Sequence, residues 1–229
     1  MSRLFVICEG QTEETFVNEV LASHLYAKGW TSVSARIMGN ARQRAKRGGI
    51  KGWSTVRHEI ALRLKEDSGC YVTTLVDYYA LPKSGKKEWP GRIQAETESY
   101  ANRASLIEEA LRNDFSKQAR SGAADRFLPF ILVHEFEALC FADCDAFCNG
   151  IGQPDMAKAM KAIRDAFESP EEINDSPETA PSKRIIDLHP SYEKPVEGNI
   201  GILEISLEKL REECRHFSDW ISDLEEIVS

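Results

Sequence analysis

The chain has no long apolar run. None of its segments approaches the roughly 20 consecutive apolar residues that a membrane-spanning helix needs. The apolar stretch after Met1-Ser2-Arg3 is too short for a signal-peptide core, and no small-residue cleavage site follows it. We therefore expect a cytoplasmic protein with no membrane partner.

Several motifs that would assign a function are also absent. No Gly-x-x-x-x-Gly-Lys-[Ser/Thr] sequence occurs, so we expect no ATP hydrolysis by this chain. His134 has no second histidine at the spacing of a His-Glu-x-x-His zinc site. An excess of positive charge is missing too, because the formal net charge is -8. Any contact with nucleic acid must then come from local basic segments.

Cysteine is present, but its pattern does not predict disulfides. Six cysteines in 229 residues without an export signal favour free thiols in a reducing compartment. Cys140, Cys144 and Cys148 recur every four residues and would share one face of a helix. Zinc binding is one interpretation of this spacing, and buried core cysteine is the commoner one.

Apolar runs alternate with helical patterns through most of the chain. The runs that predict strands cover residues 4–8, 31–38, 70–76 and 127–133. The β-α-β-α order predicts an α/β fold over residues 1–150, with a mostly parallel sheet flanked by helices. A long helix is expected at about 93–115. Residues 151–229 are expected to form a helical and loop extension that packs on this core, with little periodicity over 168–201 and final helices near 203–214 and 217–227.

Acidic residues stand directly at the ends of the predicted strands. Glu9 follows the first strand, Asp77 ends the third, and His134-Glu135 follows the fourth. The carboxyl ends of parallel strands meet at one edge of a sheet, so these carboxylates should converge. Such clusters suit Mg²⁺ or Mn²⁺, which polarise phosphoryl oxygens and lower the pKa of bound water. The pattern predicts a metal site for phosphodiester chemistry.

Each of these residues also has a structural interpretation. Glu13 and Glu14 lie in the first turn of a predicted helix with Thr12 as its N-cap, where the helix dipole favours anions. Glu13 is also four residues beyond Glu9 and could point back at the same spot. His134 is either a metal ligand or general base, or a strand-end histidine bonded to the backbone.

Two loops carry clustered positive charge. The first contains Arg42, Arg44, Lys46, Arg47 and Lys51, and the second contains Lys83, Lys86, Lys87 and Arg92. They follow the second and third strands, so parallel strands would place both beside the carboxylates as contacts for nucleic acid. Solvated charge or protein docking is the alternative. Lys183 and Arg184 are a further candidate phosphate contact, or simply the start of a helix capped by Ser182.

The segment Glu9-Gly10-Gln11-Thr12-Glu13 resembles the EGxTE signature of Toprim-like domains, which include overcoming-lysogenization-defect (OLD) type nucleases. Asp77 stands where those domains place an Asp-x-Asp motif. A wider similarity, to the bacterial family called domain of unknown function 4276, is carried by segments 76–82, 133–139, 181–185 and 214–220, which are spread over most of the chain.

The resemblance implies a Toprim-like fold and a divalent-metal-dependent nuclease. It implies catalytic roles for Glu9, Asp77 and Lys183, and metal ligands among Glu9, Glu13, Asp77, Glu135 and Glu137. In related defence systems such domains work with ABC-type or AAA ATPases, so the expected partners are an ATPase and DNA or RNA. Tyr79 replaces the second Asp of the motif. The site then borrows Glu135 or Glu137, binds metal more weakly, or is not catalytic, and the chain would be a regulatory subunit of an ATPase.

Overall fold

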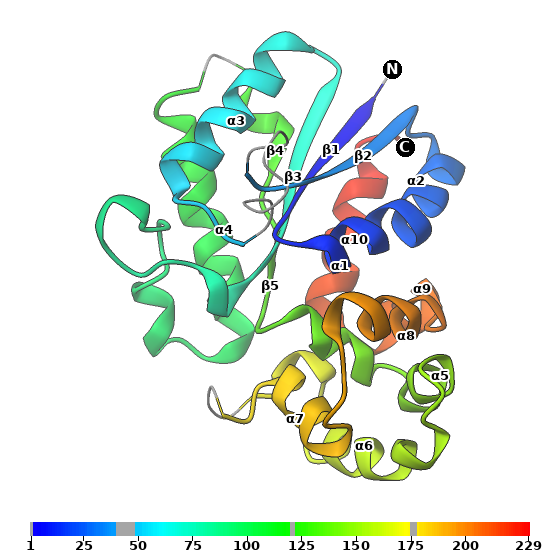
Figure 1. The fold of residues 1–229 in the computed structure, drawn as a ribbon. Helices are drawn as coiled ribbons and strands as arrows, with labels where there is room; N and C mark the ends of the chain where they lie inside the picture. Colours follow the sequence, from blue (N-terminus) through cyan, green and yellow to red (C-terminus); the bar gives the residue numbers. More distant parts are fainter. Residues whose placement is uncertain (1, 40–48, 120–121, 175–177) are drawn as a thin grey trace.

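The sheet has five strands, all of them paired in parallel. A computed structural model describes residues 2–39, 49–119, 122–174 and 178–229. The strands are β1 (Arg3–Cys8), β2 (Ser32–Ile37), β3 (Cys70–Asp77), β4 (Phe127–Leu128) and β5 (Ile131–Leu132). Their order is β2-β1-β3-β4, and β5 also pairs with β3. The prediction of an α/β fold with a mostly parallel sheet is confirmed (Figure 1).

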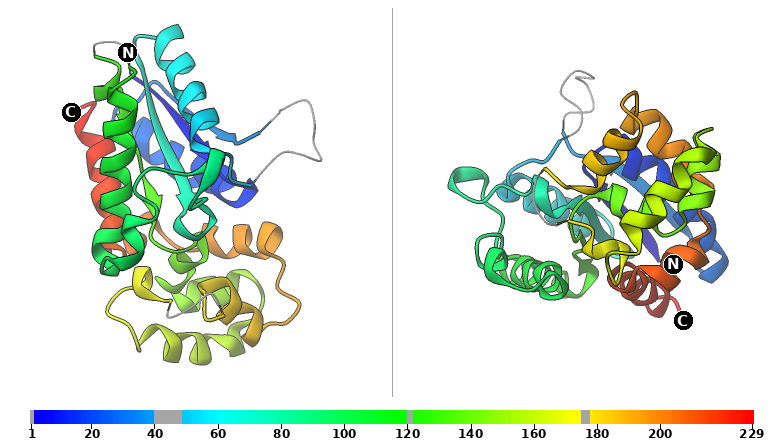
Figure 2. Two further views of the ribbon diagram at one scale, coloured as in Figure 1. Left: turned by 90° about the vertical axis from the view of Figure 1, so that its left-hand side faces the viewer. Right: turned by 90° about the horizontal axis from the view of Figure 1, so that it is seen from below.

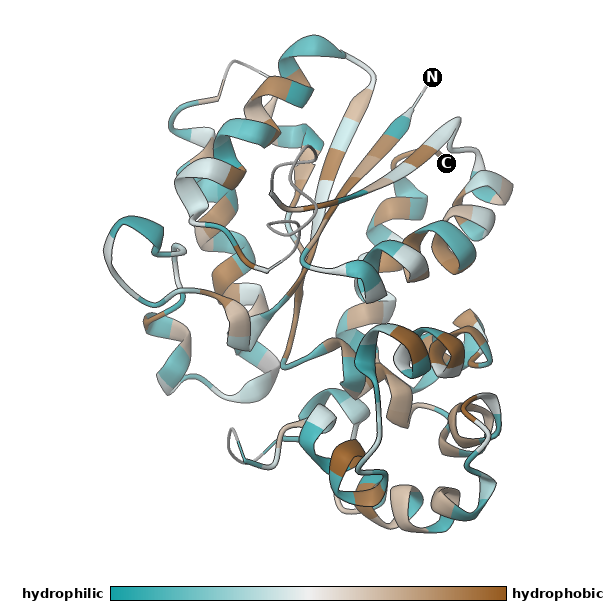
Figure 3. Ribbon diagram, in the orientation of Figure 1, coloured by the Kyte–Doolittle hydropathy of each residue, from teal (hydrophilic) through white to brown (hydrophobic). Residues whose placement is uncertain are grey.

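Two apolar clusters cover the two faces of this sheet. Leu4 and Val6 of β1 belong to the cluster on one face, and Ile7 belongs to the cluster on the other. Because β1 is buried on both faces, its sequence is continuously apolar rather than alternating. Figure 3 shows this as brown stretches along the strands, whereas the helices carry teal on their outer sides.

Helices pack on both faces (Figure 1). One face is covered by α1 (Gln11–Phe16), α2 (Ala22–Lys28) and α10 (Arg215–Glu226), and the other by α3 (Trp53–Glu66) and α4 (Tyr100–Ser116). The C-terminal helix α10 is fixed to β3, since Trp220 Nε1 donates a hydrogen bond to Thr73 Oγ1 at 3.0 Å. The Trp220 ring also stacks on Phe130, with ring centroids 4.3 Å apart.

The predicted fourth strand, residues 127–133, is divided into β4 and β5. Pro129 lies between them and has no N–H to give to a sheet ladder. The Thr74 hydroxyl of β3 bridges the interruption by donating to the carbonyl of Phe130 at 2.8 Å and accepting from its N–H at 3.0 Å. A side chain thus replaces the backbone pairing that the proline removes.

A layer of short helices lies beyond the carboxyl ends of the strands (Figures 1 and 2). It contains α5 (Cys144–Gly150), α6 (Ala157–Arg164), α7 (Pro181–Leu188), α8 (Asn199–Leu203) and α9 (Leu207–Glu213). Single-turn helices connect the longer elements: η1 (Val17–Leu21), η3 (Tyr78–Ala80), η4 (Gly85–Lys87), η5 (Gln94–Thr97), η6 (Ala124–Arg126), η7 (Phe136–Phe141), η8 (Pro154–Met156), η9 (Pro170–Glu172) and η10 (Lys194–Gly198). Residues 168–201 show little periodicity in the sequence, yet α7 and most of α8 lie there.

Other boundaries also differ from the sequence prediction. The long helix expected from residue 93 begins at Tyr100, because η5 forms a separate turn and the residues after it are extended. The two closing helices appear as α9 and α10. The division at residue 150 stays a prediction, although the apolar cluster on the α10 face includes both Leu21 and Ile202.

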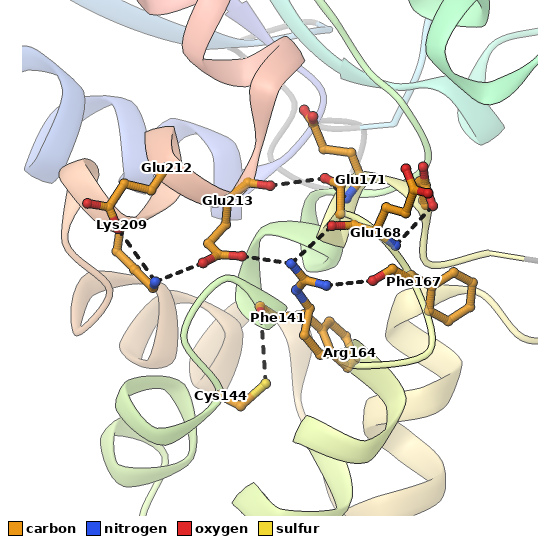
Figure 4. Close-up of polar contacts among 11 residues, drawn as sticks. Phe141, Cys144, Arg164, Phe167, Glu168, Glu171, Lys209, Glu212 and Glu213 are labelled. Carbon is orange, nitrogen blue, oxygen red and sulfur yellow. Dashed lines mark hydrogen bonds and ion pairs between the residues drawn. The ribbon is translucent and has the colours of Figure 1, made fainter.

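Polar contacts tie α6 to α9 (Figure 4). Arg164 donates to Glu213 Oε2 at 2.7 Å, and Lys209 Nζ lies 2.8 Å from the other oxygen of that carboxylate.

Glu171 is 6% exposed and accepts the backbone N–H groups of His216 and Phe217 at 2.9 and 3.0 Å. Glu171 therefore satisfies amides at the start of α10 that have no partner within the helix.

The six cysteines are all buried free thiols, as predicted. Cys140, Cys144 and Cys148 pack in the core. In the part of the chain that the structure describes, no helix has the length and apolar content needed to cross a membrane.

Candidate functional site

Four acidic side chains meet at the carboxyl edge of the sheet. Glu9 follows β1, Glu13 lies in the first turn of α1, Asp77 ends β3, and Glu137 lies in η7. Their proximity is evident electrostatically, since Glu9, Glu13 and Glu137 all raise the pKa of Asp77. We call these four acids, together with Lys194 of η10, the acidic centre. The structure therefore brings together residues that are far apart in the sequence.

The turn from β1 into α1 fixes Glu13. The N-cap position of α1 is Gly10, whose N–H donates to Glu13 Oε2 at 2.9 Å. The prediction of Thr12 as N-cap was wrong, because the helix begins two residues earlier, at Gln11. A Cβ at Gly10 would lie 3.1 Å from the same Glu13 oxygen. The glycine thus lets a buried carboxylate fold back against the end of β1.

Asp77 is held from two sides. Its Oδ1 accepts the backbone N–H of Phe136 at 2.9 Å, which joins the end of β3 to the start of η7. Its Oδ2 lies 3.7 Å from Lys194 Nζ. The same ammonium donates to Glu137 Oε2 at 2.8 Å. Lys194 therefore links two of the four acids.

Lys194 reaches this position because η10 packs on α1. Gly198 ends η10 and has no room for a side chain, since a Cβ there would lie 2.7 Å from the hydroxyl of Tyr192 and 3.9 Å from Thr12 of α1. The glycine therefore leaves room for the Tyr192 hydroxyl at the end of η10. Nothing in the local sequence marks Lys194 as a site residue, and sequence reasoning missed it.

The environment shifts the pKa values of the acidic centre. Burial, followed by the charge of Glu13, raises the pKa of Glu9 to about 7. Burial raises the pKa of Asp77 well above its usual value and also raises that of Glu137, while Lys194 opposes both shifts. Burial lowers the pKa of Lys194, but Asp77 and Glu137 raise it more, so the net pKa is above its ordinary value. The lysine stays charged, and Glu9, Asp77 and Glu137 resist ionisation.

Two carboxylate oxygens of the acidic centre are buried without a partner. Among the described residues, neither Glu9 Oε2 nor Glu137 Oε1 has a hydrogen-bond donor. A buried polar atom without a partner is unusual in folded proteins and often marks a site that takes a ligand. An ionised carboxylate oxygen can only accept, so the missing partner would be a hydrogen-bond donor such as water, or a cation; protonation is the other way to reduce the cost.

The donor set fits a hard divalent cation in chemistry, because Mg²⁺ and Mn²⁺ prefer carboxylate oxygens. The side chains are not arranged to coordinate such a cation. Within the described residues, no group of three or more His, Cys, Asp or Glu side chains is arranged to hold a metal. Glu13 is turned to Gly10, and Lys194 sits between Asp77 and Glu137. Cation binding therefore requires carboxylates to turn or the ammonium to move.

The other predicted ligand, Glu135, makes a different contact. Its Oε2 accepts the backbone N–H of Ser182 at 3.1 Å and so anchors the start of α7. The N-cap position of α7 is Ala180, which means that the prediction of a cap at Ser182 was wrong. Lys183 is exposed on α7. Arg184 donates to the carbonyl of Thr179 at 2.8 Å.

The described end of the first basic loop contacts the second basic loop. Arg42, Arg44, Lys46 and Arg47 lie outside the described residues. Trp89 of the second loop donates to the carbonyl of Lys51 at 2.8 Å, and a Cβ at Gly52 would lie 2.8 Å from Lys87 Cα. Lys83, Lys86 and Lys87 are exposed, as a nucleic-acid contact requires. Arg92 is instead 2% exposed and donates to the carbonyl of Tyr78 at 3.2 Å, so it is part of the fold rather than of the loop surface.

His134 is buried beside these elements. Among the described residues its two ring nitrogens have no hydrogen-bond partner, so the expected bond to the backbone is not present. Burial, followed by the charge of Arg103, lowers the pKa of His134 to about 4. The imidazole is therefore neutral near pH 7, and its ring stacks on Tyr79 with centroids 5.6 Å apart.

A sequence model of the family described as domain of unknown function (DUF4276) matches residues 8–225. The match includes every residue of the acidic centre and all of α10 except its last residue. No curated protein and no solved structure matches the chain.

Proposed function

The chain belongs to the DUF4276 family, and from its acidic centre we propose that it is a divalent-metal-dependent nuclease that hydrolyses phosphodiester bonds. The observation that carries the proposal is an excess of buried carboxylates over cations. Among the described residues, Glu9, Glu13, Asp77 and Glu137 have one ammonium to share, that of Lys194. Buried anions without compensation are costly, so such a centre takes up either protons or another cation. Mg²⁺ or Mn²⁺ is the cation that matches these ligands.

Glu9, Asp77 and Glu137 would hold the cation, since they include the two oxygens without partners. A bound Mg²⁺ or Mn²⁺ polarises a phosphoryl oxygen and lowers the pKa of water. Glu9 has the alternative role of general base: if it lies beside the cation without contacting it, its pKa of about 7 suits it to accept a proton from an attacking water near neutral pH. Lys194 remains charged and can stabilise negative charge that develops on the phosphate.

The nucleic-acid substrate is supported by the exposed lysines of the second basic loop and by the resemblance of residues 9–13 to Toprim-like domains. Lys83, Lys86 and Lys87 follow the strand that carries Asp77. This placement allows a polyanion to be attracted to the edge where the acids lie. The Toprim resemblance also brings an ABC-type or AAA ATPase partner and a role in antiviral defence into the proposal.

A noncatalytic regulatory subunit of an ATPase complex is the second candidate. It is favoured by Lys194, which already pairs with Glu137 at 2.8 Å and lies 3.7 Å from Asp77. In that case the ammonium permanently takes the place of a metal. The substitution of Tyr79 for the second acid of the Toprim motif is consistent with this alternative.

The two candidates separate in a cleavage assay with purified protein. Single-stranded and double-stranded DNA and RNA are incubated with Mg²⁺, Mn²⁺ or EDTA. The nuclease proposal predicts metal-dependent cleavage that Glu9→Gln and Asp77→Asn each reduce by at least about 100-fold, as is usual for loss of a catalytic group. Glu19→Gln, an exposed acid of the following turn, is the matched control and should keep full activity.

Cleavage that survives in both variants would show that the acidic centre is not the active site. Absence of cleavage with every substrate and metal, in a folded protein that binds an ATPase, would support the regulatory role instead. Circular dichroism of each variant establishes that it remains folded.

A further inference from the structure

A cavity of about 570 Å³ lies beside the acidic centre. Tyr78, Tyr79, Lys83, Arg92, Arg103 and Glu135 are among the residues that line it. Two features connect it to the acids. Tyr78 directly follows Asp77, and Glu135 precedes Phe136, whose N–H binds the Asp77 carboxylate. The cavity thus opens at the same ends of β3 and β5 as the acidic centre, and its volume is that of a small-ligand site.

Positive charge predominates in this cavity. Three cationic side chains and two carboxylates line it. Glu96 occupies two of the cations, since it pairs with Lys83 and lies 3.3 Å from Arg92. Its side chain is 40% exposed, so an incoming anion can replace it as the partner of Lys83 and of the buried Arg92. The carboxylate of Glu96 occupies the position that an anionic ligand would take.

Arg103 has hydrogen-bond donors that are not used within the described part of the chain. Its Nε donates to the carbonyl of Glu98 at 3.1 Å, but in the described part of the chain its two terminal nitrogens have no acceptor. Its guanidinium lies 5.8 Å from the centre of the Tyr78 ring. The two terminal N–H groups of a guanidinium match a phosphate in a bidentate arrangement.

The cavity also has an aromatic wall. Tyr79 stacks on His134, with an interplanar angle of 19°, and its ring meets that of Tyr78 edge to face. His134 is 1% exposed and neutral, so it supports the Tyr79 ring from behind without adding charge. A supported tyrosine ring beside a guanidinium is the usual platform for a nucleobase and its phosphate.

We infer that this cavity binds one nucleotide of the substrate, with its phosphate on Arg103 and Lys83 and its base on Tyr79. The inference rests on the proposed function, because it places the nucleotide next to the phosphate that reacts at the acidic centre. It also assigns a use to Tyr79. The residue that departs from the Toprim motif serves as a stacking surface instead of a metal ligand.

The test measures binding separately from cleavage. A fluorescent 5′-phosphorylated single-stranded oligonucleotide is titrated with full-length protein in EDTA, and anisotropy gives Kd. We expect Arg103→Gln and Tyr79→Ala each to weaken binding by about tenfold, whereas Tyr79→Phe, which keeps the ring, stays within about twofold. Arg112→Gln is the matched control, because Arg112 is an exposed arginine of the same helix that does not line this cavity.

Competition identifies the source of the bound group. A nucleoside monophosphate should displace the oligonucleotide at lower concentration than inorganic phosphate does, because only the nucleotide has a base. Equal competition by the two would overturn the role of Tyr79. Equal weakening by Arg103→Gln and Arg112→Gln would overturn the cavity as a site, since it would indicate general charge attraction.

The two proposals fail differently. If oligonucleotide binding depends on Arg103 and Tyr79 but no metal supports cleavage, the nuclease proposal fails and the nucleotide site stands. If metal-dependent cleavage requires Glu9 and Asp77 while both cavity variants bind like wild type, the nuclease proposal stands and the nucleotide site fails.

Discussion

Two buried carboxylate sites in this molecule differ in how completely they are satisfied. Glu171, between the helical layer and α10, has both oxygens bonded to backbone N–H groups at 2.9 and 3.0 Å. In the acidic centre, Glu9 Oε2 and Glu137 Oε1 have no donor among the described residues. Glu171 and Glu137 are both buried glutamates, so residue type and burial do not separate the two sites. The hydrogen-bonding capacity that remains unfilled in the acidic centre does.

The pKa values express the same difference. Burial raises the pKa of Glu171, but the amides of His216 and Phe217 act against that rise and favour the ionised form. Around Glu9 and Asp77 the neighbouring acids add to the effect of burial. The ionised form of Glu171 is therefore stabilised within the fold, whereas ionisation of Glu9 and Asp77 is unfavourable unless a cation binds beside them.

The largest effect should follow loss of the satisfied acid. Glu171→Ala leaves two amides at the start of α10 without partners and should lower the free energy of unfolding by about 3 kcal/mol. Glu171→Gln keeps one acceptor oxygen and should lose about half as much. Urea unfolding measures both variants. A loss below about 1 kcal/mol for the alanine variant would remove the contrast between the two sites.

Removal of the resident ammonium should have the next largest effect. Lys194→Met leaves Asp77 and Glu137 without their cation, and we expect a loss of about 2 kcal/mol at pH 8. The value lies below that for a fully buried pair because the lysine side chain is 39% exposed. The loss should shrink at pH 5, where the acids can take up protons. Urea unfolding at the two pH values provides the check, and a loss independent of pH would contradict the assignment.

Replacement of Glu9 should stabilise the protein. Its pKa is raised to about 7 in the fold, so the folded state binds more protons than the unfolded one between pH 4.5 and 7. Stability from this group is present at low pH and is lost as the pH rises through 7. The shift would correspond to about 3 kcal/mol for a fully buried group, and the partial exposure of Glu9 reduces this value. Glu9→Gln removes that loss and should be more stable than wild type by about 1 kcal/mol at pH 8, with no gain at pH 4. Thermal unfolding of both proteins across this pH range measures the difference, and a variant that is no more stable than wild type at pH 8 would contradict the prediction.

The smallest effect is expected in the network of Figure 4. Lys209 is 37% exposed and pairs with Glu212 and Glu213 on the same helix. Lys209→Met should change the free energy of unfolding by less than about 0.5 kcal/mol, because exposed ion pairs are weak. An effect as large as that of Lys194→Met would mean that ion pairing alone, and not burial of acids, sets the energetics of both regions.

The sheet was predictable, whereas the composition of the acidic centre was predictable only in part. A continuous apolar run specifies β1, and a run rich in apolar and β-branched residues specifies β3. Since the two strands are parallel, Glu9 and Asp77 at their carboxyl ends lie at the same edge of the sheet. Pro129 divided the fourth strand, a break that its missing N–H could have indicated. Lys194 could not be found in this way, because its place depends on how η10 packs against α1. Such contacts between distant segments leave no periodic trace in the sequence.

The most direct test of the account is a calorimetric titration with Mn²⁺ at pH 7, repeated in two buffers of different ionisation enthalpy. If the acidic centre exchanges protons for a cation, Mn²⁺ binds with release of protons, and Asp77→Asn abolishes the binding. Absence of binding, or binding that Asp77→Asn leaves unchanged, would contradict the claim that these carboxylates form a cation site.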